Sequence, residues 1–213
     1  LEQGIWLEDG DIIYCGKDRE RIKICSIHDM KLLGKHNYEN VMAAAALAIH
    51  AGVPLDCIRK AIREFNAVEH RIEFVREADG VKYYNDSKGT NPDAAIKAVE
   101  AMVTKTVVIG GGYDKQASYD EWIASFGDKV KCLVLIGATA DKIADAATKA
   151  GFKNIIKASS LEEAVKISSS EAEEGEAVLL SPACASWGMF KNYEERGRKF
   201  KEYVNRLPVK RQE

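Results

Sequence analysis

The sequence predicts an α/β protein whose larger part is a mainly parallel, doubly wound sheet, preceded by the last part of a second α/β domain. Two patterns support this prediction. From residue 72 onward, strand-like runs alternate with helix-like runs of about 10–15 residues, which is typical of a parallel sheet covered on both faces. Residues 1–64 instead begin with strand-like segments and continue with two helical ones. We therefore expect a domain boundary near residue 70, with domains at 1–70 and 71–213.

The composition is that of an ordinary globular protein. Of the 213 residues, 46% are hydrophobic and 30% are charged, and the formal net charge is −2. Lysine and arginine are scattered among acidic residues, which argues against nucleic acid as the main partner. Five cysteines without a C-x-x-C pair favour reduced thiols in the cytoplasm, and no apolar run approaches the roughly 18 residues that membrane insertion requires. The chain begins at Leu1, without methionine, which indicates a fragment or a processed start.

The first domain is expected to start with strands and to end with helices. The expected strands are Gly4–Leu7, Asp11–Tyr14 and Arg21–Cys25, and they resemble the edge of a sheet whose other strands are missing. Two helices are expected within residues 37–64. Asn37 is a candidate N-cap of the first helix, Gly52 ends it, and Pro54 suits the first turn of the second helix.

The second domain is expected to alternate strands and helices. Its expected strands are Val81–Tyr84, Thr106–Ile109, Leu133–Ile136, Asn154–Ile156 and Ala177–Leu180. One helix should start at Asn91-Pro92, where the asparagine can cap the helix and proline is tolerated in its first turn. Ser118-x-x-Glu121 and Ser160-x-x-Glu163 have the pattern of capping boxes. The last helix is expected from about Tyr193 to Arg206.

Polar sequences follow several of the expected strands. In open parallel sheets, ligands bind beyond the carboxyl ends of the strands. The polar strand ends are Asn85–Thr90, Gly110–Lys115 and Ser181–Ser186, whereas Gly137-Ala138-Thr139 has fewer polar side chains. Lys88 and Lys115 suit an anionic ligand, and Thr90 and Ser186 lie near expected helix starts, where free backbone N–H groups favour carboxylate or phosphate. This rim of the sheet is therefore the candidate site.

Each candidate side chain also has a simpler interpretation. A loop lysine can be a solvated charge, and Ser186 can cap a helix. Asn37 and Asn40 are one helical turn apart and can face one adenine edge, but they can also be a cap and a surface residue. Arg71 can bridge to phosphate or form an inter-domain ion pair. Asp86 can hold a nucleotide hydroxyl or orient a lysine.

Several well-known site patterns are absent from the sequence. The dinucleotide fingerprint would require glycine where Lys115 stands, so the glycines before it are expected to serve a tight turn. The segment from Gly10 to Lys17 is one residue too long for a Walker A loop, and it is followed by Asp18. We find neither metal-ligand spacing nor a Gly-x-Ser-x-Gly motif.

Taken together, several segments resemble the motifs of one family. They are His36-Asn37-Tyr38-Glu39-Asn40, His70-Arg71-Ile72-Glu73, Asn85-Asp86-Ser87-Lys88-Gly89-Thr90-Asn91-Pro92, Gly110-Gly111-Gly112-Tyr113-Asp114-Lys115, and Leu180–Trp187 with Lys191–Gly197. In order and spacing, over roughly residues 36–200, they are similar to the Mur ligases, and most similar to the members that add D-glutamate.

The resemblance implies a fold and a reaction. Residues 71–213 would be a Rossmann-like domain that binds D-glutamate, and residues 1–70 the C-terminal part of a central ATPase domain. The phosphate loop, the Mg²⁺ ligands and a carbamylated lysine would lie upstream. The whole protein would be a monomeric, cytoplasmic, ATP-dependent amide ligase of peptidoglycan synthesis that joins D-glutamate to UDP-N-acetylmuramoyl-L-alanine through an acyl phosphate. The fragment alone would be inactive.

The resemblance also implies residue roles. Near ATP it places Asn37, Asn40, Arg71 and Asp86, and around D-glutamate it places Lys88, Thr90, Lys115, Ser186, Trp187 and Tyr193. It assigns neither a catalytic residue nor a metal ligand to this chain. Gly188 departs from the pattern, because aspartate is expected there. The alternatives are another Mur-type ligase, which adds a different amino acid or adds glutamate to folate, and a non-catalytic ligand-binding module.

Overall fold

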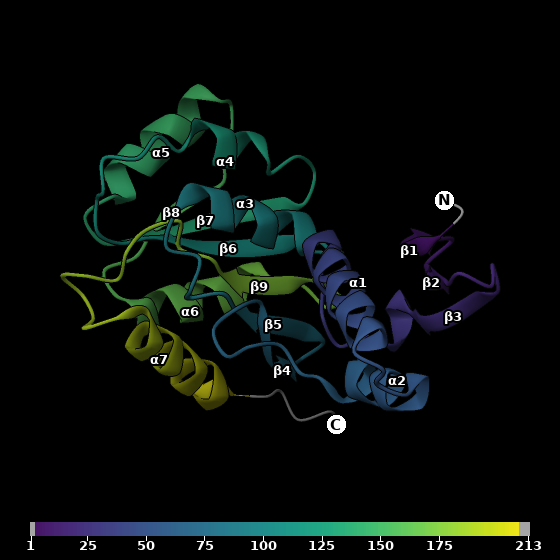
Figure 1. Cartoon of the computed structure of the whole chain (residues 1–213). Coiled ribbons are helices and arrows are strands. Elements are labelled where there is room, and N and C mark those ends of the chain that lie inside the picture. Colours follow the sequence, from purple (N-terminus) through teal and green to yellow (C-terminus); the bar gives the residue numbers. More distant parts are fainter. Residues whose placement is uncertain (1–2, 209–213) are drawn as a thin grey trace. The chain divides into compact units, whose positions relative to one another are not determined.

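The computed structural model describes residues 3–208, which form two compact units (Figure 1). The first unit is Leu1–Ala67 and the second is Val68–Glu213. The sequence had placed the domain boundary at residues 70 and 71. No helix of the described chain is long and apolar enough to cross a membrane.

The first unit is a small antiparallel sheet with two α-helices. Its strands β1 (Gly4–Glu8), β2 (Asp11–Cys15) and β3 (Arg21–Ser26) pair in the order β1-β2-β3, and a 3-10 turn, η1 (Ile27–Asp29), follows. The helices are α1 (Lys35–His50) and α2 (Leu55–Glu64). Asp9 and Gly10 both have positive φ, as the tight turn between β1 and β2 requires. The buried core of this unit contains Ile12, Ile24, Cys25, Met30, Ala45 and Ile58.

The start of α1 corrects one prediction. Gly34, with φ of 95°, is the N-cap, and the helix begins at Lys35. Asn37 lies inside the first turn, and its amide nitrogen donates a hydrogen bond to the carbonyl of Leu33 at 2.7 Å. The prediction that Asn37 caps this helix is therefore wrong. The chain enters the helix through a residue with positive φ, a conformation that glycine adopts without strain.

The second unit is built on a six-stranded sheet. Its strands are β4 (Glu73–Ala78), β5 (Val81–Asn85), β6 (Thr106–Gly111), β7 (Val130–Ile136), β8 (Ile155–Lys157) and β9 (Ala177–Leu180). They lie in the order β4-β5-β9-β6-β7-β8. All pairs are parallel except β4 with β5, which confirms a mainly parallel sheet. The antiparallel edge strand β4 was not predicted.

Helices cover both faces of this sheet, as Figure 1 shows. They are α3 (Pro92–Ala101), α4 (Asp120–Ala124), α5 (Ala140–Lys149), α6 (Leu161–Glu171) and α7 (Tyr193–Arg206). Helices α6 and α7 pack on one face, and α3, α4 and α5 pack on the other. Strand β6 shows why both faces are covered: Val107 and Ile109 join the first core, and Val108 joins the second.

The helix caps agree only partly with the sequence patterns. Asn91 accepts a hydrogen bond from the backbone of Ala94 and caps α3, as predicted. Ser160 caps α6, but the Glu163 carboxylate accepts a hydrogen bond from the amide of Ser159 rather than from that of Ser160. Ser118 does not cap α4, because it lies one residue before the N-cap position, and that capping-box prediction is wrong.

The strand order places three polar loops side by side. Strand β9 lies between β5 and β6, so the carboxyl ends of these three strands are neighbours at one edge of the sheet. Helices α3 and α4, which follow β5 and β6, cover one face of the sheet, whereas α7, which follows β9, covers the other, and such a switch leaves room for a ligand. The rim predicted from the sequence is therefore one continuous structural region of the second unit.

Candidate functional site

The candidate site consists of three loops that follow neighbouring strands. We name them the first loop (residues 86–91, after β5), the second loop (112–119, after β6) and the third loop (181–192, after β9). Each leaves a buried strand and leads into a helix, α3, α4 or α7. The ends of the loops are thus fixed by the sheet and the helices.

Backbone contacts join the second loop to the third. The amide of Gly111 donates to the carbonyl of Pro182 at 2.8 Å, and the amide of Tyr113 donates to the carbonyl of Ala185 at 2.9 Å. Gly112, with φ of +150°, approaches the third loop so closely that an added Cβ would overlap the carbonyl oxygen of Ala185. The glycine run therefore serves a close approach of two backbones.

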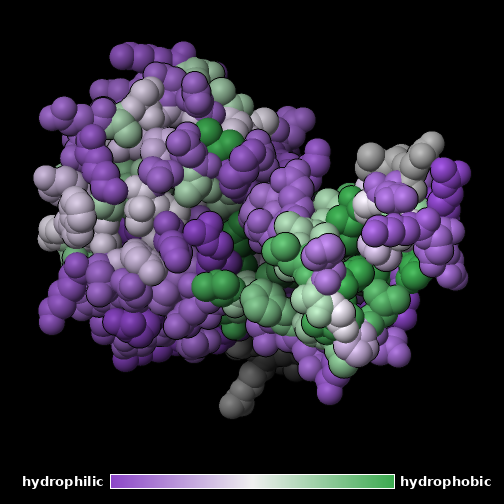
Figure 2. Space-filling view, in the orientation of Figure 1, coloured by the Kyte–Doolittle hydropathy of each residue, from purple (hydrophilic) through white to green (hydrophobic). Residues whose placement is uncertain are grey.

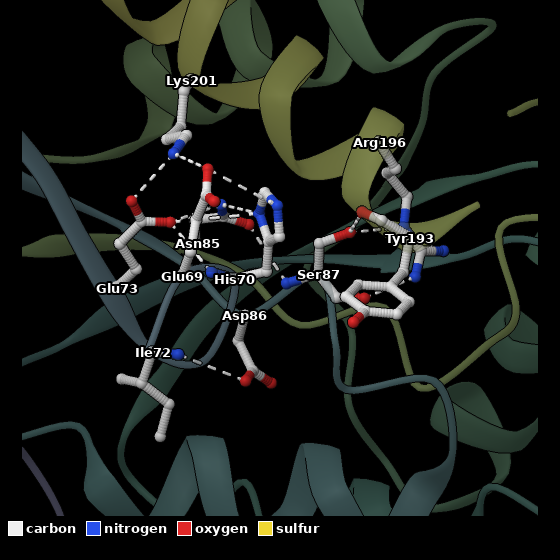
Figure 3. Close-up of polar contacts among 10 residues, drawn as sticks. All are labelled: Glu69, His70, Ile72, Glu73, Asn85, Asp86, Ser87, Tyr193, Arg196 and Lys201. Atoms are coloured by element: carbon white, nitrogen blue, oxygen red, sulfur yellow. Dashed lines mark hydrogen bonds and ion pairs between the residues drawn. The ribbon is translucent and has the colours of Figure 1, made fainter. Parts of the chain in front are cut away.

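Arg196 of α7 joins the first loop to the third, and Figure 3 shows its contact with Ser87 of the first loop. Its side chain is 1% exposed. It donates from Nε to Ser87 Oγ at 3.0 Å, from Nη2 to the Ser87 carbonyl at 2.8 Å, and from Nη1 to the Cys184 carbonyl at 3.0 Å. Ser87 in turn donates to the carbonyl of Tyr193 at 2.7 Å. Burial lowers the pKa of Arg196 to about 10, so the guanidinium stays charged at neutral pH.

Asp86 is the buried carboxylate of the first loop. It is 4% exposed and accepts hydrogen bonds from the Ser181 hydroxyl at 2.8 Å and the Ile72 amide at 3.3 Å. Burial raises the pKa of Asp86 to about 7, although these hydrogen bonds and the nearby Arg71 act in the opposite direction. Asp86 therefore holds the start of the first loop against the third loop and against Ile72, the residue before β4.

A buried histidine, His70, also fixes the first loop. The side-chain nitrogen of Asn85 donates to His70 Nδ1 at 2.9 Å and to the Glu73 carboxylate at 3.0 Å (Figure 3). Since Nδ1 accepts a hydrogen bond, the ring is neutral with its proton on Nε2, and burial lowers its pKa. The carbonyl of His70 accepts from the amide of Lys88 at 3.0 Å, so this residue shapes the first loop.

Glu69, His70 and Glu73 could be considered as metal ligands, because their ligand atoms lie within 4.8 Å of one another. The ammonium of Lys201, however, already bridges the two carboxylates, at 2.7 Å to Glu69 and 2.9 Å to Glu73. The lysine supplies the positive charge that an ion would bring, so the cluster is explained without one.

The predicted D-glutamate residues lie on the three loops, except Tyr193, which begins α7 directly after the third loop. The ammonium of Lys115 lies 5.4 Å above the ring of Trp187, which in turn packs edge-on against Tyr113 at 5.6 Å. Lys88 lies 5.8 Å from the ring of Tyr193. Both lysines and Trp187 are exposed, which leaves the cations free to meet an anionic ligand.

Ser186 and Thr90 lie deeper in the loops. Ser186 is 3% exposed, and its carbonyl accepts from the amides of Met189 and Phe190. It does not cap α7, because Asn192 does so through a bond to Glu195. Thr90 is half-buried beside Gly89. Gly188, which stands where the resemblance predicts aspartate, has φ of +84°, a conformation that suits glycine.

The predicted nucleotide residues are divided between the two units. Arg71 and Asp86 belong to the second unit, and Arg71 is exposed. Asn37 and Asn40 belong to the first unit, on the first turns of α1, where Asn40 is exposed and the Asn37 amide nitrogen is already bonded within its own unit.

Three residues of the site were missed by the sequence analysis, namely Ser87, Thr139 and Arg196. Ser87 and Arg196 lie inside the quoted motifs, but nothing in a single sequence distinguishes a buried arginine from a surface one. Thr139 follows β7, at the strand end where the sequence analysis found few polar side chains. The signal that could have identified Thr139 is a hydroxyl placed just before the start of a helix.

A pocket of about 1400 Å³ lies elsewhere in the second unit. It lies beside the Asp79-Gly80 turn before β5 and is bounded by α6 and the end of α7. Its lining mixes acidic with basic side chains, and it contains no residue of the three loops. The pocket is therefore separate from the candidate site on the three loops.

The sequence is similar to known ligases over nearly its whole length. It is 58% identical over 207 residues to a UDP-N-acetylmuramoylalanine–D-glutamate ligase from Lachnoclostridium phytofermentans, covering 97% of this chain and 45% of the relative. The ligase of the same name from Lachnospira eligens is 57% identical over 199 residues, covering 93% and 44%. The chain thus spans less than half the length of these relatives.

Solved structures show the same fold at low sequence identity. A UDP-N-acetylmuramate–alanine ligase from Thermotoga maritima matches with a TM-score of 0.65 at 20% identity, covering 92% of this chain and 43% of that one. A folylpolyglutamate synthase from Mycobacterium tuberculosis matches with a TM-score of 0.63 at 16% identity, covering 96% and 47%. Residues 70–184, which contain the first two loops and the start of the third, match the family model for the Mur ligase glutamate ligase domain. The chain therefore belongs to the Mur ligase family.

Proposed function

We propose that the protein containing this chain is an ATP-dependent ligase that adds D-glutamate to UDP-N-acetylmuramoyl-L-alanine in peptidoglycan synthesis. The observation that carries this proposal is the 58% identity to a relative of that name, which extends over 97% of the chain and so includes all three loops. The fold alone would not distinguish the acceptor, because ligases named for other substrates share it at 16–20% identity.

The rim supplies what a dicarboxylic amino acid needs. In the proposed site, the Lys115 ammonium binds a carboxylate of D-glutamate, and Ser186 and Thr90 add hydroxyl or backbone donors. Lys88 contributes positive charge from the first loop. Trp187 and Tyr193 shape the pocket next to these two lysines, consistent with their ring contacts at 5.4 and 5.8 Å.

The nucleotide contacts are proposed for the residues whose polar groups remain available. Arg71 and Asn40 are exposed and can reach a ligand. Asp86 is buried, with both carboxylate oxygens already bonded, so we propose that it acts by fixing the first loop beside Arg71. Asn37 retains its amide oxygen for adenine. We expect the Mg²⁺ ligands to lie upstream of this chain.

The proposed reaction proceeds in two steps. The substrate carboxylate attacks the γ-phosphorus of ATP, ADP leaves, and an acyl phosphate forms. The amine of D-glutamate then attacks the acyl carbon, phosphate leaves, and the amide forms with loss of a proton. The residues of this chain act by orienting the amine and neutralising the two carboxylates.

The experiment compares amino acids in the full-length protein. Phosphate release from ATP would be measured with UDP-N-acetylmuramoyl-L-alanine and, in turn, D-glutamate, L-glutamate, L-alanine and L-lysine. Turnover that depends on D-glutamate is expected. Preference for another amino acid would favour a different Mur-type ligase, and binding of ligands without turnover would favour a non-catalytic module. Residues 1–213 alone should show no turnover.

We also propose a monomer in the cytoplasm. None of the five cysteines, all of which the structure describes, forms a disulfide, and four of them are buried, which suits a reducing compartment. Sedimentation of the full-length protein and fractionation of cells test these two points.

A further inference from the structure

We propose that Thr139 is a positioning residue for the amino-acid site, an inference that rests on the proposed function. Thr139 is fully buried at the start of α5, and it follows β7 rather than any of the three strands that carry the loops. Its side chain joins the second loop to the third, and Lys115 and Ser186 extend from those two loops.

The first contact of Thr139 is with Gly112. The Gly112 amide donates to Thr139 Oγ1 at 3.0 Å, and the Gly112 carbonyl accepts from the Thr139 amide at 3.2 Å and from its hydroxyl at 3.3 Å. Both peptide groups of the glycine are thus held by one residue. Gly112 has a φ of +150°, a conformation that favours glycine, and these bonds help to fix it.

The second contact is with the third loop. Thr139 Oγ1 lies 3.3 Å from Cys184 Sγ, and the Tyr119 hydroxyl lies 3.1 Å from the same sulfur. One arrangement of protons satisfies every group: Tyr119 donates to the sulfur, the thiol donates to Thr139, and Thr139 donates to the Gly112 carbonyl. Cys184 and Tyr119 are each 2% exposed, so water does not compete for these bonds.

The positions of Lys115 on the second loop and of Ser186 on the third loop depend on these contacts. Directly after Gly112, Tyr113 pairs with Ala185, and the second loop continues to Lys115. Directly after Cys184, the third loop continues through Ala185 to Ser186. If Gly112 and Cys184 shift relative to each other, the lysine and the serine separate. Small misplacements of binding groups weaken a site strongly without unfolding the protein.

The test replaces the Thr139 hydroxyl in the full-length protein. Thr139→Val keeps the shape and removes all three side-chain hydrogen bonds, two to Gly112 and one to Cys184, whereas Thr139→Ser keeps the hydroxyl. We expect Thr139→Val to raise the KM for D-glutamate roughly 10-fold and to leave the KM for ATP within about twofold. Thr139→Ser should restore the KM for D-glutamate. A Thr139→Val enzyme with a lower melting temperature but an unchanged KM would overturn the inference.

A second pair of variants covers the case in which Thr139→Val does not fold. Cys184→Ala removes the link to the third loop and leaves the Gly112 contacts, and Cys184→Ser retains a hydrogen-bonding group. The alanine variant should raise the KM for D-glutamate and the serine variant should restore it; equal KM values in the two variants would contradict the inference. If the wild-type enzyme uses another amino acid, the proposed function fails, and the same variants test Thr139 with that amino acid.

Discussion

At the scale of single residues, Asp86 holds its carboxylate where solvent does not reach it. Its pKa is raised to about 7, above the ordinary value of 3.8. Between these two pH values the folded state keeps a proton that the unfolded state has lost. The contribution of Asp86 to the free energy of unfolding is therefore fully present below pH 3.8 and falls as the pH rises to about 7.

The first prediction follows from this decrease in stability with rising pH. Asp86→Asn keeps the shape and can still accept from the Ile72 amide at 3.3 Å, but it has no charge to bury. The free energy of unfolding of the variant, minus that of wild type, should increase with pH between about 4.5 and 7, by at most about 1.4 kcal/mol per pH unit. Urea unfolding at several pH values measures it. A constant difference across this range would show that Asp86 is ionised throughout.

Lys115 carries the second prediction, because its ammonium is exposed and lies 5.4 Å from the centre of the Trp187 ring. A charge-assisted bond to a carboxylate contributes roughly 1.5–3 kcal/mol, so Lys115→Ala should lower kcat/KM for D-glutamate about 10- to 150-fold in the full-length enzyme. The KM for ATP should change little. Lys149→Ala, an exposed lysine on α5, is the matched control. Equal damage to ATP use would contradict the assignment of the second loop.

The residues that the sequence could not reveal are those with distant partners. Lys88 and Lys115 were found because each follows a strand within a few positions, a local signal. Thr139 meets Gly112 across 27 positions, and Arg196 meets Ser87 across 109. No periodicity or motif specifies such a pairing, since it depends on which strand lies between which.

At the scale of elements, hydrophobic runs predicted the central strands well. Ala177–Leu180 was predicted with its observed bounds, because a buried strand is continuously apolar. Strand β4 was missed because its sequence, Glu73 to Ala78, neither alternates strictly nor forms a continuous apolar run, and it lies at a half-exposed edge. The Asp79-Gly80 dipeptide was an available signal: both residues have positive φ and form the hairpin turn to β5.

Helix α7 gives the third prediction, in which two effects oppose each other. Gly197 lies inside this helix, where alanine would ordinarily stabilise it by about 1 kcal/mol. An added methyl would, however, overlap the ring of His70. A hydrogen bond to Asn85 fixes this ring, so it does not move aside freely. Overpacking of this kind costs about 1–3 kcal/mol, so Gly197→Ala should lower the free energy of unfolding.

The matched control for this prediction is Arg198→Ala, at the next position of α7, where the side chain is exposed. It should change the free energy of unfolding by less than about 0.5 kcal/mol. Denaturant unfolding of residues 1–213 compares the two variants. A more stable Gly197→Ala protein would mean that α7 does not pack against His70 as described.

At the scale of the whole molecule, the first unit exposes an apolar helix face. Helix α1 has exposed Ala43 and Ala44, and Leu47 is 73% exposed. Figure 2 shows apolar residues gathered on the visible face of this unit. A helix that is apolar on several sides is normally covered by other parts of its protein. This fits a chain that spans about 45% of the length of its relatives.

The last prediction tests that account with one substitution in two contexts. In residues 1–213, Leu47→Lys should leave the melting temperature nearly unchanged and increase solubility, because the leucine is 73% exposed. In the full-length protein, where we propose that upstream residues cover this face, the same lysine would be buried without a partner. It should then lower the melting temperature by roughly 4 °C or more. His50→Lys, at the exposed end of α1, should be neutral in both. If Leu47→Lys is neutral in the full-length protein as well, the apolar face of α1 remains open to solvent there and the upstream residues do not cover it.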